Sequence, residues 1–267
     1  MNSGIETKHF SSWIDSRQSE GLYFFTKEKA LESLPLSQTA FKSAAHRLAR
    51  KKRIARIRSG FYVIVPLEYA PAGMIPPDWF INDLMAYLEE PYYVGLLSAA
   101  ALQGAGHQQP QQFQVVTTAN IPNIALSNLA IRFFKRKHFK EPFITRLKVR
   151  TGYINISTPE ATAFDLIHYA RWIGGLDRAA TVLKELSNKL DQKKLTDTAK
   201  AEGDLACAQR LGWILENHAH YKAGTLETWL SHLVKHYAKL DPSSPAKGVE
   251  KDMSWHILIN AKIEADI

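Results

Sequence analysis

Turn and cap signals that follow one another closely along residues 26–65 constrain the fold more than any other feature of the chain. Thr26 and Ser37 carry hydroxyl groups that can cap the N-terminus of a helix. Pro35 ends a helix, because its ring removes a hydrogen-bond donor and disfavours the helical conformation of the preceding residue. These signals predict a helix over residues 27–34, a tight turn, and a second helix over residues 38–52.

The second predicted helix has one narrow apolar face. Phe41, Ala44, Ala45 and Leu48 follow the i, i+3, i+4, i+7 spacing of a single helix face. At about 100° per residue, the opposite face carries Thr39, Lys42, Ser43, His46, Arg47 and Arg50. A short helix, a tight turn and a second helix with a basic, hydrogen-bonding outer face are typical of a helix-turn-helix.

A β-hairpin is predicted directly after this helix pair. Residues 54–58 and 61–65 are β-prone runs, and the Ser59-Gly60 turn between them suits a tight hairpin, because glycine accepts a positive φ. We expect Arg56 and Arg58 on one face of the first strand. The order helix, turn, helix, hairpin is that of a winged helix-turn-helix.

The positive charge of the chain is concentrated in the same region. The net charge is +8, and residues 1–66 hold 12 Lys and Arg against 5 Asp and Glu. Between Lys42 and Arg58 there are 8 basic residues and no acidic one. A small basic domain beside a nearly neutral remainder is the pattern expected when that domain binds a polyanion.

These observations predict that residues 1–66 bind double-stranded DNA. Residues early in the exposed face are expected to contact base edges, and the later arginines and lysines to contact phosphates. A single winged helix offers limited contact, so two copies on an inverted repeat are a further expectation. The alternative is a solvated or protein-binding module. The expected DNA-contacting residues are Ser37, Gln38, Thr39, Lys42, Ser43, His46, Arg47, Arg50, Lys51, Arg53, Arg56 and Arg58.

The remainder of the chain predicts a larger mixed domain. Prolines and a glycine in residues 67–76 favour an extended linker, which gives an α+β protein with domains 1–66 and 77–267. We expect helices over 79–88 and 94–103, strands over 113–118 and 129–135, and a hairpin over 146–157. A capping box formed by Ser157 and Glu160 begins a mostly helical part, and residues 255–263 are predicted as a strand.

No catalytic residue, metal site or cofactor is predicted. The chain lacks the glycine-rich phosphate-binding motifs. His232 and His236 are four apart on a predicted helix but lack the glutamate of the metalloprotease motif. Glu160 and Asp165 lie about 140° apart around a helix and do not converge on one ion. Cys207, the single cysteine, is predicted as a small core residue, so we expect a non-enzymatic protein.

A second basic segment begins near residue 132. Arg132, Lys135, Arg136, Lys137 and Lys140 are interleaved with aromatic residues, which suits a second nucleic-acid or partner surface. Side chains in this segment alternate as they do in a β-strand, which favours the competing interpretation, a strand end whose charged residues are solvated. The longest apolar stretch, 94–102, is too short to cross a bilayer. We therefore expect a cytoplasmic protein that does not contact membranes.

Three segments of the sequence resemble the AbiEi-type antitoxins of abortive-infection (type IV toxin–antitoxin) systems. They read RIRSGFYVIVPLEY, PYYVGLLSAAALQGAGHQQPQQFQVVT and ISTPEATAFDLIHYA, and the resemblance covers about residues 22–215. It implies a winged helix that represses its own operon, and a larger domain that counteracts a nucleotidyltransferase-like toxin without needing to bind it. Family members commonly have Glu-Arg-Thr where this chain has Glu160-Ala161-Thr162, which leaves the role of that helix start open.

Three functions therefore remain at the level of sequence. The first is an autorepressing antitoxin. The second is a ligand-responsive winged-helix transcription regulator without a toxin, and the third is a nucleic-acid processing enzyme. A neighbouring toxin gene distinguishes the first from the second, and a metal-dependent activity lost in Glu160→Ala or Asp165→Ala would favour the third.

Overall fold

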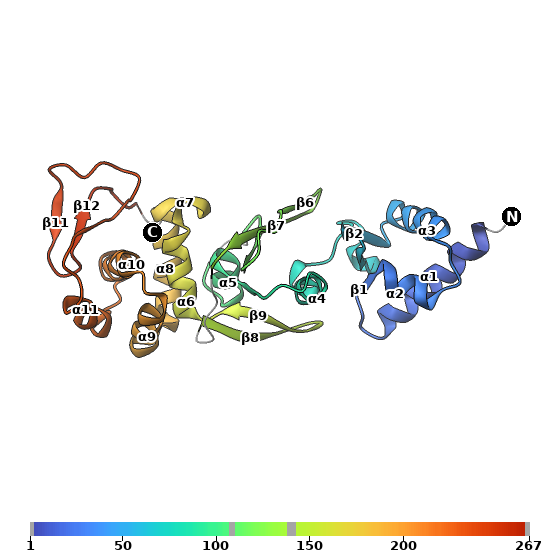
Figure 1. Ribbon diagram of the computed structural model, residues 1–267, viewed down its shortest axis with the longest axis horizontal. Coiled ribbons are helices and arrows are strands. Elements are labelled where there is room, and N and C mark those ends of the chain that lie inside the picture. Colours follow the sequence, from blue (N-terminus) through green and yellow to red (C-terminus); the bar gives the residue numbers. More distant parts are fainter. Residues whose placement is uncertain (1–2, 107–109, 138–142, 265–267) are drawn as a thin grey trace. The chain divides into compact units, whose positions relative to one another are not determined.

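The structure, a computed structural model, describes residues 3–106, 110–137 and 143–264. It contains helices and several sheets (Figure 1), so the expected α+β class is confirmed at that level. The N-terminal elements are α1 (Ser3–Ser19), β1 (Phe24–Thr26), α2 (Lys27–Ser33), α3 (Gln38–Arg50), β2 (Ile54–Arg58) and β3 (Phe61–Ile64).

Both predicted helix caps are confirmed. The Thr26 hydroxyl accepts a hydrogen bond from the Lys29 amide at 3.2 Å and begins α2. The Ser37 hydroxyl accepts one from the Ala40 amide at 3.1 Å and begins α3. These bonds satisfy amides that lack a partner within the helix, which is why short polar side chains are found at these positions.

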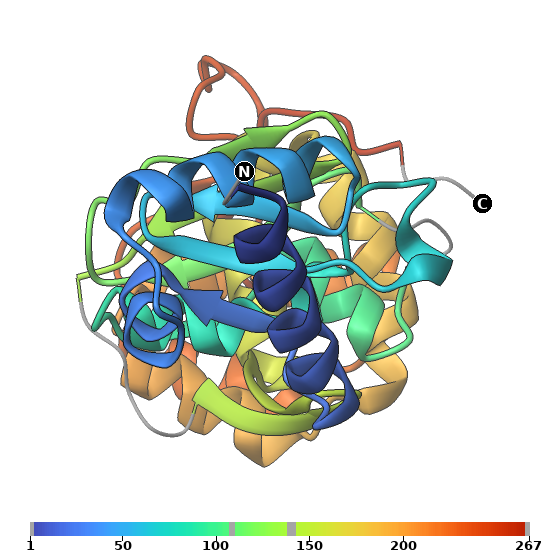
Figure 2. The same ribbon diagram turned by 90° about the vertical axis from the view of Figure 1, so that its right-hand side faces the viewer.

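The hairpin predicted after α3 forms part of a three-stranded antiparallel sheet with the order β1-β3-β2. Gly60 has φ +80°, as the tight turn requires. Figure 2 shows α1 lying across this sheet. One apolar core joins the helices to the strands; its buried members are Phe10, Ile14, Phe25, Ala30, Phe41, Ala44, Ala45, Leu48, Ile54 and Ile64.

The segment after β3 is folded rather than extended. It forms the short 3-10 helices η1 (Leu67–Tyr69) and η2 (Pro77–Trp79), and α4 (Ile81–Tyr87) follows. The buried Trp79 ring contacts the rings of Tyr23 and Tyr69, at centroid distances of 5.0 and 5.1 Å. Aromatic burial therefore outweighs the extended preference that the prolines give this segment. The division into 1–66, 67–76 and 77–267 as separate domains stays a prediction.

The expected helix over 94–103 is wrong at its start. Tyr92–Val94 is a strand, β4, and α5 (Leu96–Leu102) begins after Gly95. The other strands of the same sheet are β5 (Phe113–Thr117), β6 (Ile124–Leu126), β7 (Leu129–Lys135), β8 (Ile144–Val149) and β9 (Gly152–Ser157). The order of this sheet is β6-β7-β5-β4-β9-β8, in which β4 pairs in parallel with β9 and β6 antiparallel with β7.

The C-terminal part is mostly helical, as predicted. Its helices are α6 (Pro159–His168), α7 (Ala170–Ile173), α8 (Gly175–Leu186), α9 (Gln192–Glu202), α10 (Leu205–His218) and α11 (Gly224–Ser231). A small sheet with the order β10-β12-β11 follows, from β10 (Ala238–Lys239), β11 (Glu250–Asp252) and β12 (Ile257–Ile259). Gly212 of α10 contacts the buried Trp255 ring so closely that a Cβ there would collide with it.

The chain forms two compact units. Unit 1 consists of residues 1–92, 117–135 and 146–155, and unit 2 of residues 93–116, 136–145 and 156–267. In the described parts of both units, no helix combines the length and the apolar character needed to span a bilayer.

Candidate nucleic-acid interface and buried polar network

The outer face of α3 is exposed and basic, as predicted. Phe41, Ala44, Ala45 and Leu48 are the buried residues of the helix, which leaves the polar side of α3 exposed. The exposed residues of the expected DNA-contacting set are Ser37, Gln38, Thr39, Lys42, Ser43, His46, Arg50, Lys51 and Arg56. Local sequence explains this arrangement, because the apolar stripe fixes the rotation of the helix about its axis.

The other three arginines of that set are half-buried. Arg47 lies at the margin of the α3 face, and Arg53 forms an ion pair with Asp15 of α1. Arg58 donates from Nη2 to the Pro122 carbonyl, and its guanidinium carbon lies 5.7 Å from the centre of the Phe133 ring. Burial lowers the pKa of Arg58.

The strand geometry explains why Arg56 and Arg58 differ. The register of β2 against β3 shifts between these two residues, at a β-bulge. Arg56 is exposed, whereas Arg58 packs within unit 1. A bulge changes the direction of a side chain and breaks simple alternation, so the expectation of one shared face is wrong.

The second basic segment is divided among different surroundings. Arg132 stacks on Phe134, with its guanidinium carbon 5.0 Å from the ring centre, and Lys135 and Lys137 are exposed. Arg136 is largely buried in unit 2. Lys140 lies outside the described residues. Because Arg136 is largely buried, it cannot form part of a continuous basic surface through these positions.

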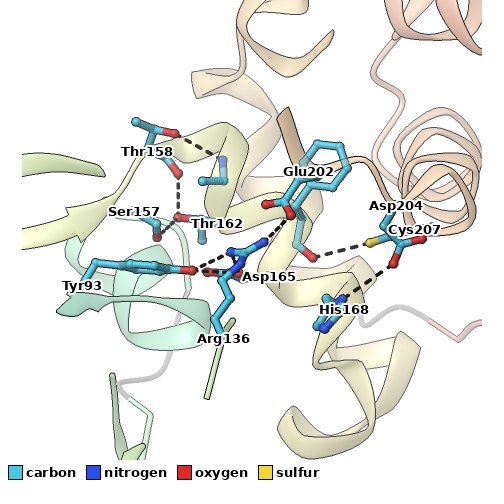
Figure 3. Close-up of polar contacts among 12 residues, drawn as sticks. Tyr93, Arg136, Ser157, Thr158, Thr162, Asp165, His168, Glu202, Asp204 and Cys207 are labelled. Atoms are coloured by element: carbon cyan, nitrogen blue, oxygen red, sulfur yellow. Dashed lines mark hydrogen bonds and ion pairs between the residues drawn. The ribbon is translucent and has the colours of Figure 1, made fainter. Parts of the chain in front are cut away.

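Arg136 belongs to a buried polar network with Tyr93, Asp165 and Glu202 (Figure 3). Its Nη1 donates to the Tyr93 hydroxyl at 2.7 Å and to Asp165 Oδ1 at 3.0 Å, and its Nη2 donates to Glu202. The Tyr93 hydroxyl in turn donates to Asp165 Oδ1 at 3.3 Å. These contacts join β4, α6 and the C-terminal end of α9 within unit 2.

The electrostatics of this network reflect two carboxylates that share one guanidinium. Burial raises the pKa of Asp165 to about 7; Arg136 opposes this shift and Glu202 adds to it. Burial alone would lower the pKa of Arg136, but Asp165 and Glu202 hold it above its usual value. The Asp165 side chain is inaccessible to solvent, so the network is suited to fixing elements in place rather than to receiving a substrate.

A glycine is required beside the network. A Cβ on Gly95 would lie 3.0 Å from Asp165 Oδ2 and 2.9 Å from Val116 Cγ2. Those separations are too short for carbon, so a larger residue would displace the buried carboxylate. From the sequence alone Gly95 is only a packing glycine, and nothing in the local pattern connects it with Asp165.

The predicted capping box at the start of α6 is wrong. Thr158 is the N-cap, and its hydroxyl accepts from the Ala161 amide at 3.3 Å. Ser157 lies in β9 and forms a 2.6 Å hydrogen bond with the Thr162 hydroxyl, while Glu160 accepts from the Asp191 amide at 3.0 Å. Glu160 and Asp165 thus have separate protein partners.

The helix expected to hold His232 and His236 ends earlier than predicted. Ser231 is the last residue of α11, and His232 follows it as the C-cap. The two histidines therefore do not share a helix face. The backbone carbonyl of His236 accepts a hydrogen bond from Gln209 at 3.2 Å.

Part of the chain matches a known protein family, and a solved structure has a similar fold. Residues 93–217 match the family described as the AbiEi antitoxin C-terminal domain. The crystal structure of the RV2827C protein from Mycobacterium tuberculosis is similar, with a TM-score of 0.68 and 13% identity over 92% of this chain and 89% of that one. At this identity the similarity shows the fold alone.

A second solved structure is much less similar. The solution structure of the antibiotic-resistance factor ANT(2'')-Ia gives a TM-score of 0.33 at 11% identity, over 52% of this chain and 93% of that one. That score is too low to indicate a shared fold. No curated protein matches the chain in sequence.

Proposed function

We propose that the chain, whose residues 93–217 match the AbiEi antitoxin C-terminal domain family, is an antitoxin that also represses its own operon by binding DNA. In this proposal residues 1–66 form a winged helix-turn-helix that contacts the operator, and residues 77–267 carry the antitoxin activity. The toxin is a nucleotidyltransferase-like protein encoded beside it. The antitoxin acts in the cytoplasm, without catalysis and without requiring direct contact with the toxin.

The observation that carries DNA binding is the exposed basic face of α3. The stretch from Lys42 to Arg58 contains 8 basic residues and no acidic one, and the buried stripe of α3 turns its polar side to solvent. Helix-turn-helix proteins place such a helix in the major groove, where phosphate neutralisation supplies affinity and base edges supply specificity.

Individual residues have different proposed roles. Thr39, Lys42, Ser43 and His46 lie in the first half of α3 and are exposed, so we assign them to base edges. Arg50 and Lys51 lie at its C-terminal end and are assigned to phosphates. Arg56 is the wing residue that we assign to the backbone of the DNA. Arg58 has a structural role instead, because its guanidinium is bound within unit 1.

A ligand-responsive regulator is the second candidate, and one observation favours it. Unit 2 contains a cleft of about 750 Å³ bounded by α6, α7, α8, α10 and the segments that follow β10 and β12. Arg171, Arg210 and Lys262 are among its lining residues. Clefts of this volume accept small ligands. Under this alternative the chain binds operator DNA but protects no cell from a neighbouring toxin.

The test of DNA binding is fluorescence anisotropy with the full-length chain. The duplexes are the sequence upstream of its own gene and a scrambled version, each at low and at physiological salt. The proposal predicts binding to the native duplex at least about 1000-fold tighter at physiological salt. Equal binding to both duplexes, lost steeply with salt, would contradict it and leave only a nonspecific basic patch.

The antitoxin part is tested separately by co-expression. The gene adjacent to this chain is induced with and without the antitoxin, and growth is followed. The proposal predicts rescue by the full-length chain, and also by a variant with Lys42→Ala, because DNA contacts are not needed to counteract the toxin. Absence of any growth defect from the adjacent gene, together with specific DNA binding, would favour the ligand-responsive regulator.

A further inference from the structure

Three side chains that can bind metal lie together where the end of α6 meets the start of α10 (Figure 3). His168 is the last residue of α6, Asp204 is the N-cap of α10, and Cys207 lies in the first turn of α10. One ligand atom from each, all within 4.8 Å of one another, defines the group. The DNA-binding and antitoxin proposals make no use of these residues.

The local fold explains why the three converge. Asp204 Oδ1 accepts a hydrogen bond from the Cys207 amide at 2.9 Å, which folds the carboxylate back over the first turn of α10. Its other oxygen, Oδ2, lies 3.8 Å from His168 Nδ1. The buried Cys207 thiol donates to the Phe164 carbonyl of α6 at 3.8 Å. The cap thus leaves Oδ2 near the imidazole, and a carboxylate oxygen of Asp204 also lies within 4.8 Å of the Cys207 thiol.

We propose that His168, Asp204 and Cys207 bind a zinc ion, with a fourth coordination position open to solvent. Thiolate, imidazole and carboxylate are the ligands that Zn²⁺ accepts in proteins, whereas Mg²⁺ and Ca²⁺ prefer oxygen alone. Three protein ligands and one open position are the arrangement found where zinc remains accessible. The zinc site is independent of the proposed function.

The distances require only a modest movement of side chains. In a tetrahedral zinc site the ligand atoms are about 3.3–3.6 Å apart, from bond lengths near 2.0 Å to N and O and 2.3 Å to S. The separations here exceed this by about 1.5 Å at most. The His168 and Asp204 side chains are 52% and 45% exposed, so they can rotate toward the fixed, buried Cys207.

The cleft of unit 2 supplies a path for the ion. His168 and Asp204 line the same cleft of about 750 Å³, so an ion entering it meets two of its ligands first. Zinc binding releases the thiol proton of Cys207 to solvent as the zinc–sulfur bond forms. Burial raises the pKa of the Cys207 thiol well above its usual value, so the metal charge must stabilise the thiolate.

The test is a titration of the metal-free, full-length chain with Co²⁺, followed by competition with Zn²⁺. Cobalt bound to a thiolate absorbs in the near ultraviolet, which reports on the Cys207 ligand directly. The expected result is one Co²⁺ per chain with this band, displaced by Zn²⁺. Absence of the band in the wild-type chain at a metal concentration well above that of the protein would overturn the proposal.

Variants separate coordination from effects on folding. Cys207→Ser should abolish the band. His168→Ala and Asp204→Asn should weaken binding at least about tenfold; asparagine retains the helix cap, so Asp204→Asn removes only the charge. His232→Ala, at another exposed histidine of unit 2, is the matched control and should leave the affinity unchanged. If His168→Ala and His232→Ala bind Co²⁺ with equal affinity, the proposed site is wrong, even if Cys207→Ser fails to fold.

Discussion

The α3 face and the Arg136 network both contain charged side chains from basic stretches of sequence, but their surroundings differ in kind. Lys42 and Arg50 are exposed on α3. Arg136 is 14% exposed and contacts two carboxylates, one of which is fully buried. The basic side chains of α3 therefore face solvent, whereas the Arg136 guanidinium is held by carboxylates of the same chain. Arg58 resembles Arg136 in this respect, because its guanidinium donates to a backbone carbonyl of the same chain.

The largest expected effect comes from breaking the buried network. Arg136→Ala leaves Asp165 and Glu202 buried without their cation, which should lower the free energy of unfolding by about 3–5 kcal/mol. Urea denaturation monitored by circular dichroism measures this loss. The matched control is Lys137→Ala, at the exposed neighbouring residue, which should change stability by less than about 0.5 kcal/mol. Similar losses of stability in the two variants would show that Arg136 contributes no more to stability than an exposed basic residue does.

A pH dependence is expected from the same network. The folded-state pKa of Asp165 is raised to about 7 from 3.8, so the folded state binds its proton more tightly than the unfolded state does. The Asp165 contribution to stability is therefore fully present below pH 4 and is lost as the pH rises toward 7. Each pKa unit between the unfolded and folded values corresponds to about 1.4 kcal/mol.

Urea denaturation between pH 4 and 7 checks this sign against Asp165→Asn, which cannot titrate. The wild-type chain should lose stability with rising pH relative to the variant. If the difference in unfolding free energy between the two chains stays constant across this range, or if the wild type gains stability relative to the variant, the effect of Arg136 on the pKa of Asp165 outweighs that of burial.

A substitution beside the network should have a smaller effect. In Gly95→Ala the added Cβ meets Val116 and the buried Asp165 at about 3 Å, and overpacking of this kind costs about 1–3 kcal/mol. Thermal unfolding reports the loss. Gly224 of α11 is the control, because a Cβ there has open space around it, so Gly224→Ala should be neutral or slightly stabilising. Equal melting temperatures for both variants would contradict the close contact at Gly95.

On the α3 face, Lys42→Ala should leave stability unchanged and weaken DNA binding. If Lys42 contacts a base edge, the variant should lose about 1–3 kcal/mol of binding free energy on the native duplex and much less on a scrambled one. Anisotropy with both duplexes measures the difference. An equal loss on the two sequences would reassign Lys42 to the phosphate backbone.

The smallest expected effect is that of Arg50→Ala. As a phosphate contact, Arg50 should contribute to all duplexes alike, so the variant weakens binding generally and reduces the slope of log affinity against log salt by about one. Binding measured at four or more salt concentrations gives the slope. An unchanged slope would mean that Arg50 does not contact phosphate.

Local signals explain which parts of the fold could be predicted from the sequence. Thr26, Ser37 and the Ser59-Gly60 turn act within a few residues, and each determines the predicted cap or turn. The start of α6 shows the limit of such signals. Ser157 and Thr158 are adjacent residues with hydroxyl groups. Because β9 pairs with β4, Ser157 stays in the strand, and Thr158 caps α6 instead.

Contacts between distant residues explain what could not be predicted. Arg136 is 43 residues from Tyr93, 29 from Asp165 and 66 from Glu202 in sequence. Its position in a basic run suggested a surface, and only the fold brings the two carboxylates to it. An aspartate within the apolar stretch of α6 was the one available signal, since a buried carboxylate requires a cationic partner.

The most direct test compares the two regions in one assay, with operator affinity measured by anisotropy for the wild type, Lys42→Ala and Asp165→Asn under conditions where all three are folded. We expect Lys42→Ala to bind the native duplex about 10–100-fold more weakly than the wild type, and Asp165→Asn to bind within about twofold of wild type. Loss of specific binding in Asp165→Asn, with Lys42→Ala unaffected, would contradict the assignment of DNA binding to the α3 face.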